Sequence, residues 1–103
     1  MEEIIMNLIL HSGEVRSYSM EAIQDAKRGN IEEARILIEK ADKELAESHK
    51  VQTSLIQNEA AGNKTEVSLL LVHAQDHLMT SMTVKDLAIE IIDIHEKLEL
   101  IKK

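Results

Sequence analysis

The stretch KRGNIEE, residues 27–33, decides the fold, because one helical pattern stops within it and another starts. Lys27 and Arg28 are basic residues of the kind that favour the negative end of a helix dipole, and Gly29 can adopt the left-handed conformation that ends a helix. Asn30, with Glu33 three residues later, is typical of a capping box at the start of a second helix. So short a connection predicts two antiparallel neighbouring helices.

The spacing of apolar and small residues on either side of this turn predicts helices over about residues 2–28 and 31–60. In both segments these residues recur every three or four positions and form one stripe. The first stripe is Ile5, Leu8, Ser12, Val15, Ser19, Ala22 and Ala26, and the second is Ala34, Ile38, Ala41, Leu45, Ser48, Gln52 and Leu55.

A second break lies at residues 60–63, Ala-Ala-Gly-Asn, and a third helix is expected over about residues 65–101. Its start is predicted either at Asn63, with Glu66 at capping-box spacing, or at Thr65. Residues 80–83 are a candidate position for a kink in this third helix. The predicted fold is all-α, an antiparallel three-helix bundle running up, down and up.

The third segment is apolar on more than one side. One stripe consists of Val67, Leu70, Ala74, His77, Ser81, Val84, Ala88, Ile91, His95 and Leu98. Further apolar residues lie outside it, among them Leu69, Leu71, Val72, Leu78, Met79, Met82, Leu87, Ile92 and Ile94. Because two helices cannot easily cover so wide a surface, we expect an oligomer built around the third helix. The alternative is that this helix is wedged between the other two in the same chain.

Composition narrows the classes of function. The 103 residues are 44% hydrophobic, which suits a single folded domain over residues 1–103. The sequence has no cysteine, which excludes disulfides and thiolate chemistry. The net charge of −7 opposes binding to nucleic acid. The most apolar run, residues 67–72, is far shorter than the roughly 20 residues that cross a bilayer, so we expect no membrane insertion and a cytoplasmic protein.

The candidate site is a cluster on one side of the third helix, formed by His73, Asp76, His77 and Thr80. Ordinary polar residues can also fall on one side of a helix by chance. In that case the protein would be a helical interaction module without catalysis. His73, Asp76 and His77 weakly resemble the inverted zinc-hydrolase motif, which favours a metal-dependent hydrolase whose third ligand comes from elsewhere.

Covalent catalysis by His73 is the other use of this cluster. An imidazole is largely uncharged at pH 7 and offers a nucleophilic nitrogen without a separate base. Such a site needs a hydrogen bond that fixes the ring tautomer, which Gln75 or a backbone carbonyl could supply. His11 and His49 are expected to be packing or surface residues. His95 has Glu96 beside it, but neighbours in a helix point apart, so it is left out of the site as well.

At these residues the sequence resembles the enzyme IIA component of the lactose/cellobiose class of the bacterial phosphoenolpyruvate-dependent sugar phosphotransferase system. The strongest similarity is VSLLLVHAQDHLMTSM, residues 67–82, and it extends to residues 9–16, 22–29, 49–56 and 91–98. Relatives often have a longer leader before the first helix.

The resemblance implies a phosphocarrier in sugar uptake. His73 would accept a phosphoryl group from the histidine-containing phosphocarrier protein and pass it to a cysteine of enzyme IIB, with Gln75 and His77 in support. It also implies a homotrimer in which Asp76 meets its symmetry mates around a structural divalent cation, expected to be Mg²⁺. Three carboxylates in an apolar interface repel one another unless metal or protons neutralise them, which agrees with that role.

Overall fold

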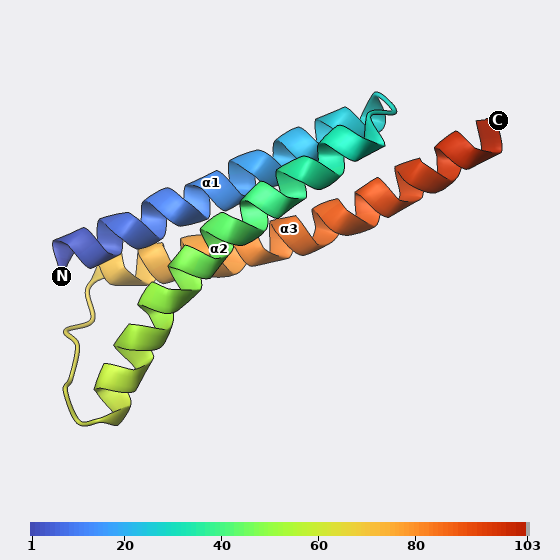
Figure 1. Ribbon diagram of the computed structural model, residues 1–103. Helices are drawn as coiled ribbons and strands as arrows, with labels where there is room; N and C mark the ends of the chain where they lie inside the picture. The colour runs from blue at the N-terminus through green and yellow to red at the C-terminus, as the bar shows by residue number, and fades with distance from the viewer. Residues whose placement is uncertain (103) are drawn as a thin grey trace.

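The computed structural model describes residues 1–102 as three helices, α1 (Glu2–Lys27), α2 (Ile31–Ala60) and α3 (Leu69–Lys102). α2 runs back along α1, and α3 then runs in the direction of α1 (Figure 1). The result is a rod with extents of 59 × 20 × 17 Å. The predicted all-α, up-down-up bundle is confirmed.

The turn between α1 and α2 closes through the backbone. Gly29 has a φ of +84° and donates its N–H to the carbonyl of Ala26 at 3.0 Å, while Asn30 donates to the carbonyl of Asp25 at 2.9 Å. These two hydrogen bonds form a Schellman motif, which satisfies the last carbonyls of α1. The predicted capping box is wrong in one respect, because the Asn30 side chain makes no cap hydrogen bond.

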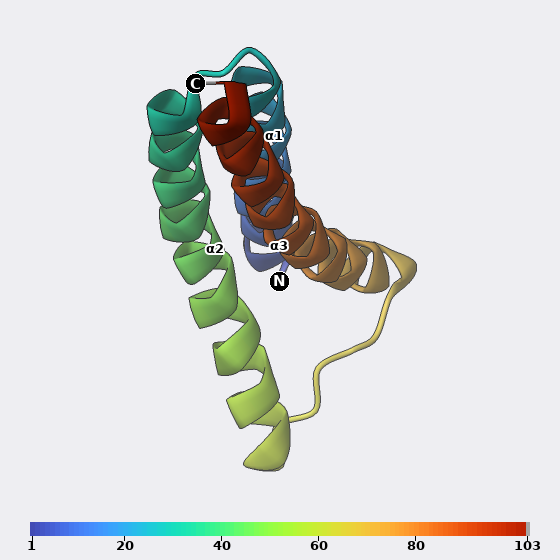
Figure 2. The same cartoon turned by 90° about the vertical axis from the view of Figure 1, so that its right-hand side faces the viewer.

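α1 is the central helix of the bundle. It packs against both neighbours, whereas α2 and α3 touch each other far less and separate toward the C-terminal end of α2 (Figure 2). All seven residues of the stripe predicted for the first helix are buried. Those predicted for the second are buried as well, except Gln52, which is half-buried. Amphipathic periodicity thus gave the packing faces of α1 and α2.

α3 begins at Leu69, later than the predicted start at about residue 65. Ser68 is the capping residue, because its hydroxyl accepts the N–H of Leu71 and its carbonyl accepts the N–H of Val72, both at 3.1 Å. The helix continues unbroken through residues 80–83, where Thr80 and Thr83 donate their hydroxyls to carbonyls one turn earlier.

The buried side of α3, hereafter the inner face, is shifted by one residue from the predicted stripe at several positions. It consists of Leu71, Ala74, Leu78, Ser81, Ala88 and Ile92. Leu78 and Ile92 are buried in place of their neighbours His77 and Ile91, because small residues at 74, 81 and 88 let α1 approach closely. A helix that is apolar on most sides leaves this choice open in the sequence.

The opposite side of α3, hereafter the outer face, exposes large aliphatic side chains. These are Leu69, Val72, Met79, Leu87, Ile94, Leu98 and Ile101. The alternative in which α3 is wedged between the other two helices is therefore wrong, since α3 packs mainly on α1. Despite this apolar surface, none of the helices within residues 1–102 is long and apolar enough to cross a membrane.

Ion pairs link α2 to α3 beyond the apolar core. Arg35 donates to Asp93 at 2.7 Å and to Glu96 at 3.1 Å, and Lys85 donates to Asp42 at 2.6 Å. The hydrogen bond that Arg35 donates to the Asp93 carboxylate raises the pKa of Arg35 above its ordinary value. These contacts hold the C-terminal half of α3 against the N-terminal half of α2.

Candidate functional site

Two imidazoles form the centre of the candidate site. His73 and His77 lie one turn apart on α3, with their Nε2 atoms 3.1 Å apart and their ring centroids 4.5 Å apart at an interplanar angle of 89°. In such a pair one ring donates its N–H and the other accepts with its lone pair. His73 is exposed and His77 is half-buried, so a partner molecule has access to the first ring.

The position of this pair follows from the local sequence. Ser68 caps the start of α3, and Leu71, Ala74 and Leu78 fix the rotation of the helix by packing inward. His73 lies next to Ala74, which is fully buried, and is turned by about 100° away from it. The core of the bundle therefore holds the His73 ring at the surface on a rigid element.

Asp76 lies on the outer face, close to the pair in sequence but separate in its contacts. Its side chain is exposed and makes no hydrogen bond or ion pair with any residue in the described range 1–102. Thr80 donates to the backbone carbonyl of Asp76 at 2.8 Å, leaving the carboxylate free. A free carboxylate in an apolar surface is costly to bury without a counter-charge.

A metal-dependent hydrolase is not favoured by this arrangement. Among residues 1–102, no three His, Cys, Asp or Glu side chains are grouped so that they could hold a metal ion. His73, Asp76 and His77 therefore do not form a ligand set within one chain. A structural cation shared between copies is a separate question, because its ligands would come from several chains.

Gln75 occupies a different place from the one the sequence suggested. It points toward α2, where its Oε1 accepts a hydrogen bond from Gln52 Nε2 at 2.8 Å. The expected hydrogen bond from Gln75 to His73 is not found within the chain, because residues two apart point to opposite sides of a helix. His77 is the partner of His73 instead. Sequence reasoning placed Gln52 only in a packing stripe.

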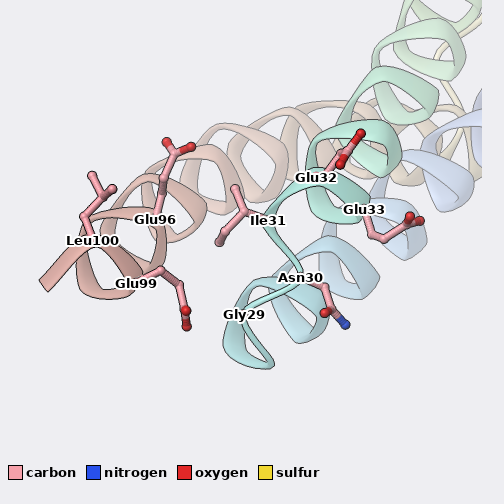
Figure 3. A pocket seen from close by; sticks show the side chains of 8 residues that line it. All are labelled: Gly29, Asn30, Ile31, Glu32, Glu33, Glu96, Glu99 and Leu100. Atoms are coloured by element: carbon pink, nitrogen blue, oxygen red, sulfur yellow. The ribbon is translucent and has the colours of Figure 1, made fainter. Parts of the chain in front are cut away.

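The other polar features lie away from this pair. His11 bonds Glu44 of α2, a packing role that its position allowed. A cleft of about 490 Å³ lies at the opposite end of the bundle, between the α1–α2 turn and the end of α3 (Figure 3). Its polar lining is mostly carboxylate, Glu32, Glu33, Glu96 and Glu99, and it contains no nucleophile.

Comparison with known proteins decides between the remaining hypotheses. The family described as "PTS system, Lactose/Cellobiose specific IIA subunit" matches residues 3–96. The chain belongs to this family. It is therefore an enzyme IIA, a component of a phosphotransferase system, and a helical interaction module without catalysis is not favoured.

Individual relatives agree with this family across almost the whole chain. The lichenan-specific phosphotransferase enzyme IIA component of Bacillus subtilis (strain 168) is 59% identical over 98 residues, which is 95% of this chain and 89% of the relative. The N,N'-diacetylchitobiose-specific EIIA component of Escherichia coli (strain K12) is 46% identical over 99 residues, or 96% of this chain and 85% of the relative.

Solved structures show the same fold. The crystal structure of the cellobiose-specific enzyme IIA from Bacillus anthracis superposes with a TM-score of 0.94 at 55% identity, covering 96% of this chain and 91% of that one. A solution structure of the IIA(Chitobiose)–HPr complex from Escherichia coli gives a TM-score of 0.82 at 46% identity, covering 95% of each chain. The enzyme IIA fold thus includes the helix that carries His73.

Proposed function

We propose that this enzyme IIA carries a phosphoryl group on His73 during sugar uptake. The observation that carries the proposal is the exposed His73 ring, held beside His77 on a helix whose inner face is fixed by the core. The donor is the histidine-containing phosphocarrier protein, which the solution structure of a relative contains as HPr. The acceptor is a cysteine of enzyme IIB.

The transfer exchanges one bond to phosphorus for another. A ring nitrogen of His73 uses its lone pair to form a bond to phosphorus while the nitrogen–phosphorus bond of the donor phosphohistidine breaks, and that electron pair returns to the donor ring. In the second step the cysteine thiolate forms a sulfur–phosphorus bond, and the electron pair of the breaking bond returns to His73. No separate oxidant or metal is needed for the balance.

His77 supports the phosphoryl group in this proposal. Its ring lies within hydrogen-bonding distance of His73, with 3.1 Å between the two Nε2 atoms. A phosphoryl group arriving at this nitrogen replaces that hydrogen bond, so a His77 N–H becomes free to donate to a phosphoryl oxygen. Donors aimed at developing negative charge are a main source of catalysis.

The assembly is proposed to be a homotrimer around the outer face of α3. Its support is the row of exposed aliphatic side chains that the other two helices leave uncovered. Asp76 lies within this row, where Val72 is 51% and Met79 is 53% exposed. Copies packed on this face would bring their Asp76 carboxylates together.

A divalent cation, with Mg²⁺ as the expected ion, is proposed to neutralise the Asp76 carboxylates. The chemistry fits, because carboxylate oxygen is the ligand that Mg²⁺ prefers and Asp76 has no other partner among residues 1–102. The ion would offset charge repulsion between copies and take no part in phosphoryl transfer.

The cellular setting follows from these partners. Enzyme IIA must meet the phosphocarrier protein and enzyme IIB, so we place it in the cytoplasm, without insertion into the membrane. The sugars in the names of its relatives include lichenan, N,N'-diacetylchitobiose and cellobiose. We therefore propose that its permease imports a β-linked oligosaccharide.

Phosphorylation by the purified phosphotransferase chain tests this function. The protein is incubated with phosphoenolpyruvate, enzyme I and the phosphocarrier protein, and the acid-labile adduct is measured. We expect an adduct in the natural protein and none in His73→Ala. His95→Ala is the matched control, since it removes a half-buried histidine of the same helix and should leave the adduct unchanged. An adduct of normal yield in His73→Ala would overturn the proposal.

A further inference from the structure

A charged residue lies within the inner face of α3. Most buried residues of this face follow one another at intervals of three or four positions, but seven positions separate Ser81 from Ala88. Lys85 occupies the position between them and, at about 100° per residue, lies on the same side of the helix. Its side chain is 14% exposed, and its Nζ donates to Oδ1 of Asp42 on α2 at 2.6 Å. A lysine thus holds a packing position, where one carboxylate of a neighbouring helix pairs with it.

The outer face of α3 follows a similar spacing on the opposite side of the helix. Asp76 lies within it, four residues after Val72 and three before Met79, and all three side chains are exposed. Nine residues separate Asp76 from Lys85, which places the two side chains about 180° apart around the helix. α3 therefore has two apolar faces, with a lysine in one and a carboxylate in the other.

The amount of apolar surface does not favour the inner face. The outer face carries seven large apolar residues, and the inner face carries three, Leu71, Leu78 and Ile92. Burial of large apolar side chains would by itself turn the outer face inward. The small residues of the inner face favour the observed packing by letting α1 approach closely, and the two charges add a second reason.

The charges distinguish the faces because only one of them has a partner. With the inner face packed, Lys85 is paired with Asp42, and the Asp76 carboxylate remains in solvent. With the outer face packed instead, Lys85 would lose its partner and Asp76 would enter an apolar contact. A charge that is buried without a counter-charge is costly.

The choice of face also decides which histidine is exposed. At about 100° per residue, His73 lies roughly 120° from Lys85 and 60° from Asp76, whereas His77 lies roughly 80° and 100° from them. With the inner face packed, His73 is exposed and His77 is half-buried. Half a turn of α3 about its axis would reverse this order.

We propose that Lys85 is a positioning residue, whose ion pair with Asp42 selects the face of α3 that packs inward and so keeps the His73 ring on the exposed side. This role goes beyond the stability that one ion pair adds, because the wrong rotation both breaks the pair and buries an unpaired carboxylate. The effect on phosphoryl transfer rests on the proposed function of His73. The selection of the face does not depend on that function.

Reversing the charge of residue 85 tests the selection. Lys85→Glu places a carboxylate opposite Asp42, so the pair becomes repulsive and the inner face loses its electrostatic advantage. Lys85→Glu combined with Asp42→Lys restores opposite charges in exchanged positions. Lys85→Gln is the milder variant, because it removes the charge and keeps a donor. Lys43→Glu is the matched control, since it makes the same charge change at an exposed lysine next to Asp42.

Two cysteine reporters distinguish rotation of α3 from unfolding. The natural chain has no cysteine, so each reporter protein carries a single thiol. Ala88→Cys places it on the inner face of α3, and Ala22→Cys places it on α1, at two fully buried positions of the same cluster. Rotation of α3 exposes residue 88 alone, whereas unfolding of the bundle exposes both positions. The rate of reaction with a maleimide measures this exposure.

We expect Lys85→Glu to speed the reaction at residue 88 at least roughly tenfold, with residue 22 still protected. Lys85→Gln should give a smaller change in the same direction. The exchanged pair should restore protection at residue 88, and Lys43→Glu should behave like the natural protein. Equal acceleration at both reporters, or an exchanged pair that does not restore protection, would overturn the selection of the face by Lys85.

Transfer from phosphorylated HPr connects the rotation to His73. We expect Lys85→Glu to slow transfer and the exchanged pair to recover it, in the same order as the protection of residue 88. If residue 88 becomes as reactive as an unprotected thiol while transfer keeps its natural rate, Lys85 does not position His73. If His73 of the natural protein takes no phosphoryl group, the proposed function fails, while the thiol measurements still decide the selection of the face.

Discussion

The inner face of α3 buries small and large residues together, whereas the outer face leaves large apolar residues exposed. Ala74, Ser81 and Ala88 are fully buried on the inner face, and Ser81 Oγ donates to the Ser12 carbonyl of α1 at 2.8 Å. On the outer face Leu87 is 58% and Ile94 is 57% exposed. The inner side of the helix is covered by α1, while the large apolar residues of the outer side are left uncovered by the other two helices.

This difference explains where a phosphocarrier site can lie. A helix buried on all sides would hide its histidines. A helix whose outer side was polar would offer no apolar surface on which copies could pack. His73 lies at the border between the two faces, where the ring stays accessible while the backbone beneath it is fixed by Ala74 and Leu78. The comparison predicts that substitutions on the inner face affect folding and those on the outer face affect assembly.

Enlarging the inner face should have the greatest effect. Ser81→Leu places a large side chain where α1 and α3 touch and removes the hydrogen bond to Ser12, so the free energy of unfolding should fall by about 3 kcal/mol. Thermal and urea unfolding followed by circular dichroism measure it. Thr83→Leu, at an exposed position two residues later, is the control and should change stability little. Equal losses in both variants would show that the faces do not differ.

Removing the second imidazole at the border should slow transfer without harming the fold. His77→Ala deletes the proposed donor to the phosphoryl group, so we expect a rate about 10²-fold lower and an unchanged site of attachment. Rapid-quench kinetics with phosphorylated HPr give the rate. His77→Asn, which keeps an N–H donor on a shorter side chain, should recover part of it. An unchanged rate in His77→Ala would remove His77 from the site.

Weakening the outer face should reduce assembly and leave each chain helical. Leu87→Ser removes apolar area that the proposed trimer buries, at a cost of roughly 2 kcal/mol per chain. Sedimentation across a range of concentrations should show smaller species at low concentration, with the helical circular dichroism signal retained. Leu100→Ser, at an exposed leucine of the same helix that lies outside the outer face, should not weaken assembly. A Leu87→Ser protein that assembles like the natural one would contradict the role of this face.

Replacing the charge on the outer face should have the smallest effect on stability. Asp76→Leu substitutes an apolar side chain for mutually repelling carboxylates, so the trimer should persist and gain about 1 kcal/mol while losing the cation. Native mass spectrometry and metal analysis report both quantities. Dissociation to monomers would show instead that Asp76 and its ion hold the copies together.

The sequence predicts α1 and α2 down to individual buried residues, because their apolar positions alternate with polar ones. It predicts the inner face of α3 less well, because Leu70 and Leu71 are equally apolar and only packing against α1 selects the second. A related reason explains why Ser68 caps α3, so that the helix begins later than predicted. Asn63, Thr65 and Ser68 are all acceptable caps, and local sequence alone does not choose among them.

The site shows the same division between local and long-range information. The pairing of His73 with His77 follows from a spacing of four residues on one helix. The hydrogen bond from Gln52 to Gln75 joins residues 23 positions apart on two helices, so no local pattern indicates it. The exposed outer face was expected from the excess of apolar residues, but the number of copies that cover it rests on the family resemblance.

Locating the phosphoryl group among the five histidines tests the account most directly. The protein is phosphorylated from phosphoenolpyruvate through enzyme I and HPr, digested at a pH that preserves phosphohistidine, and sequenced by electron-transfer mass spectrometry. We predict that the modified peptide carries the group on His73. A phosphoryl group on His77 or on any other histidine, with His73 unmodified, would contradict the account.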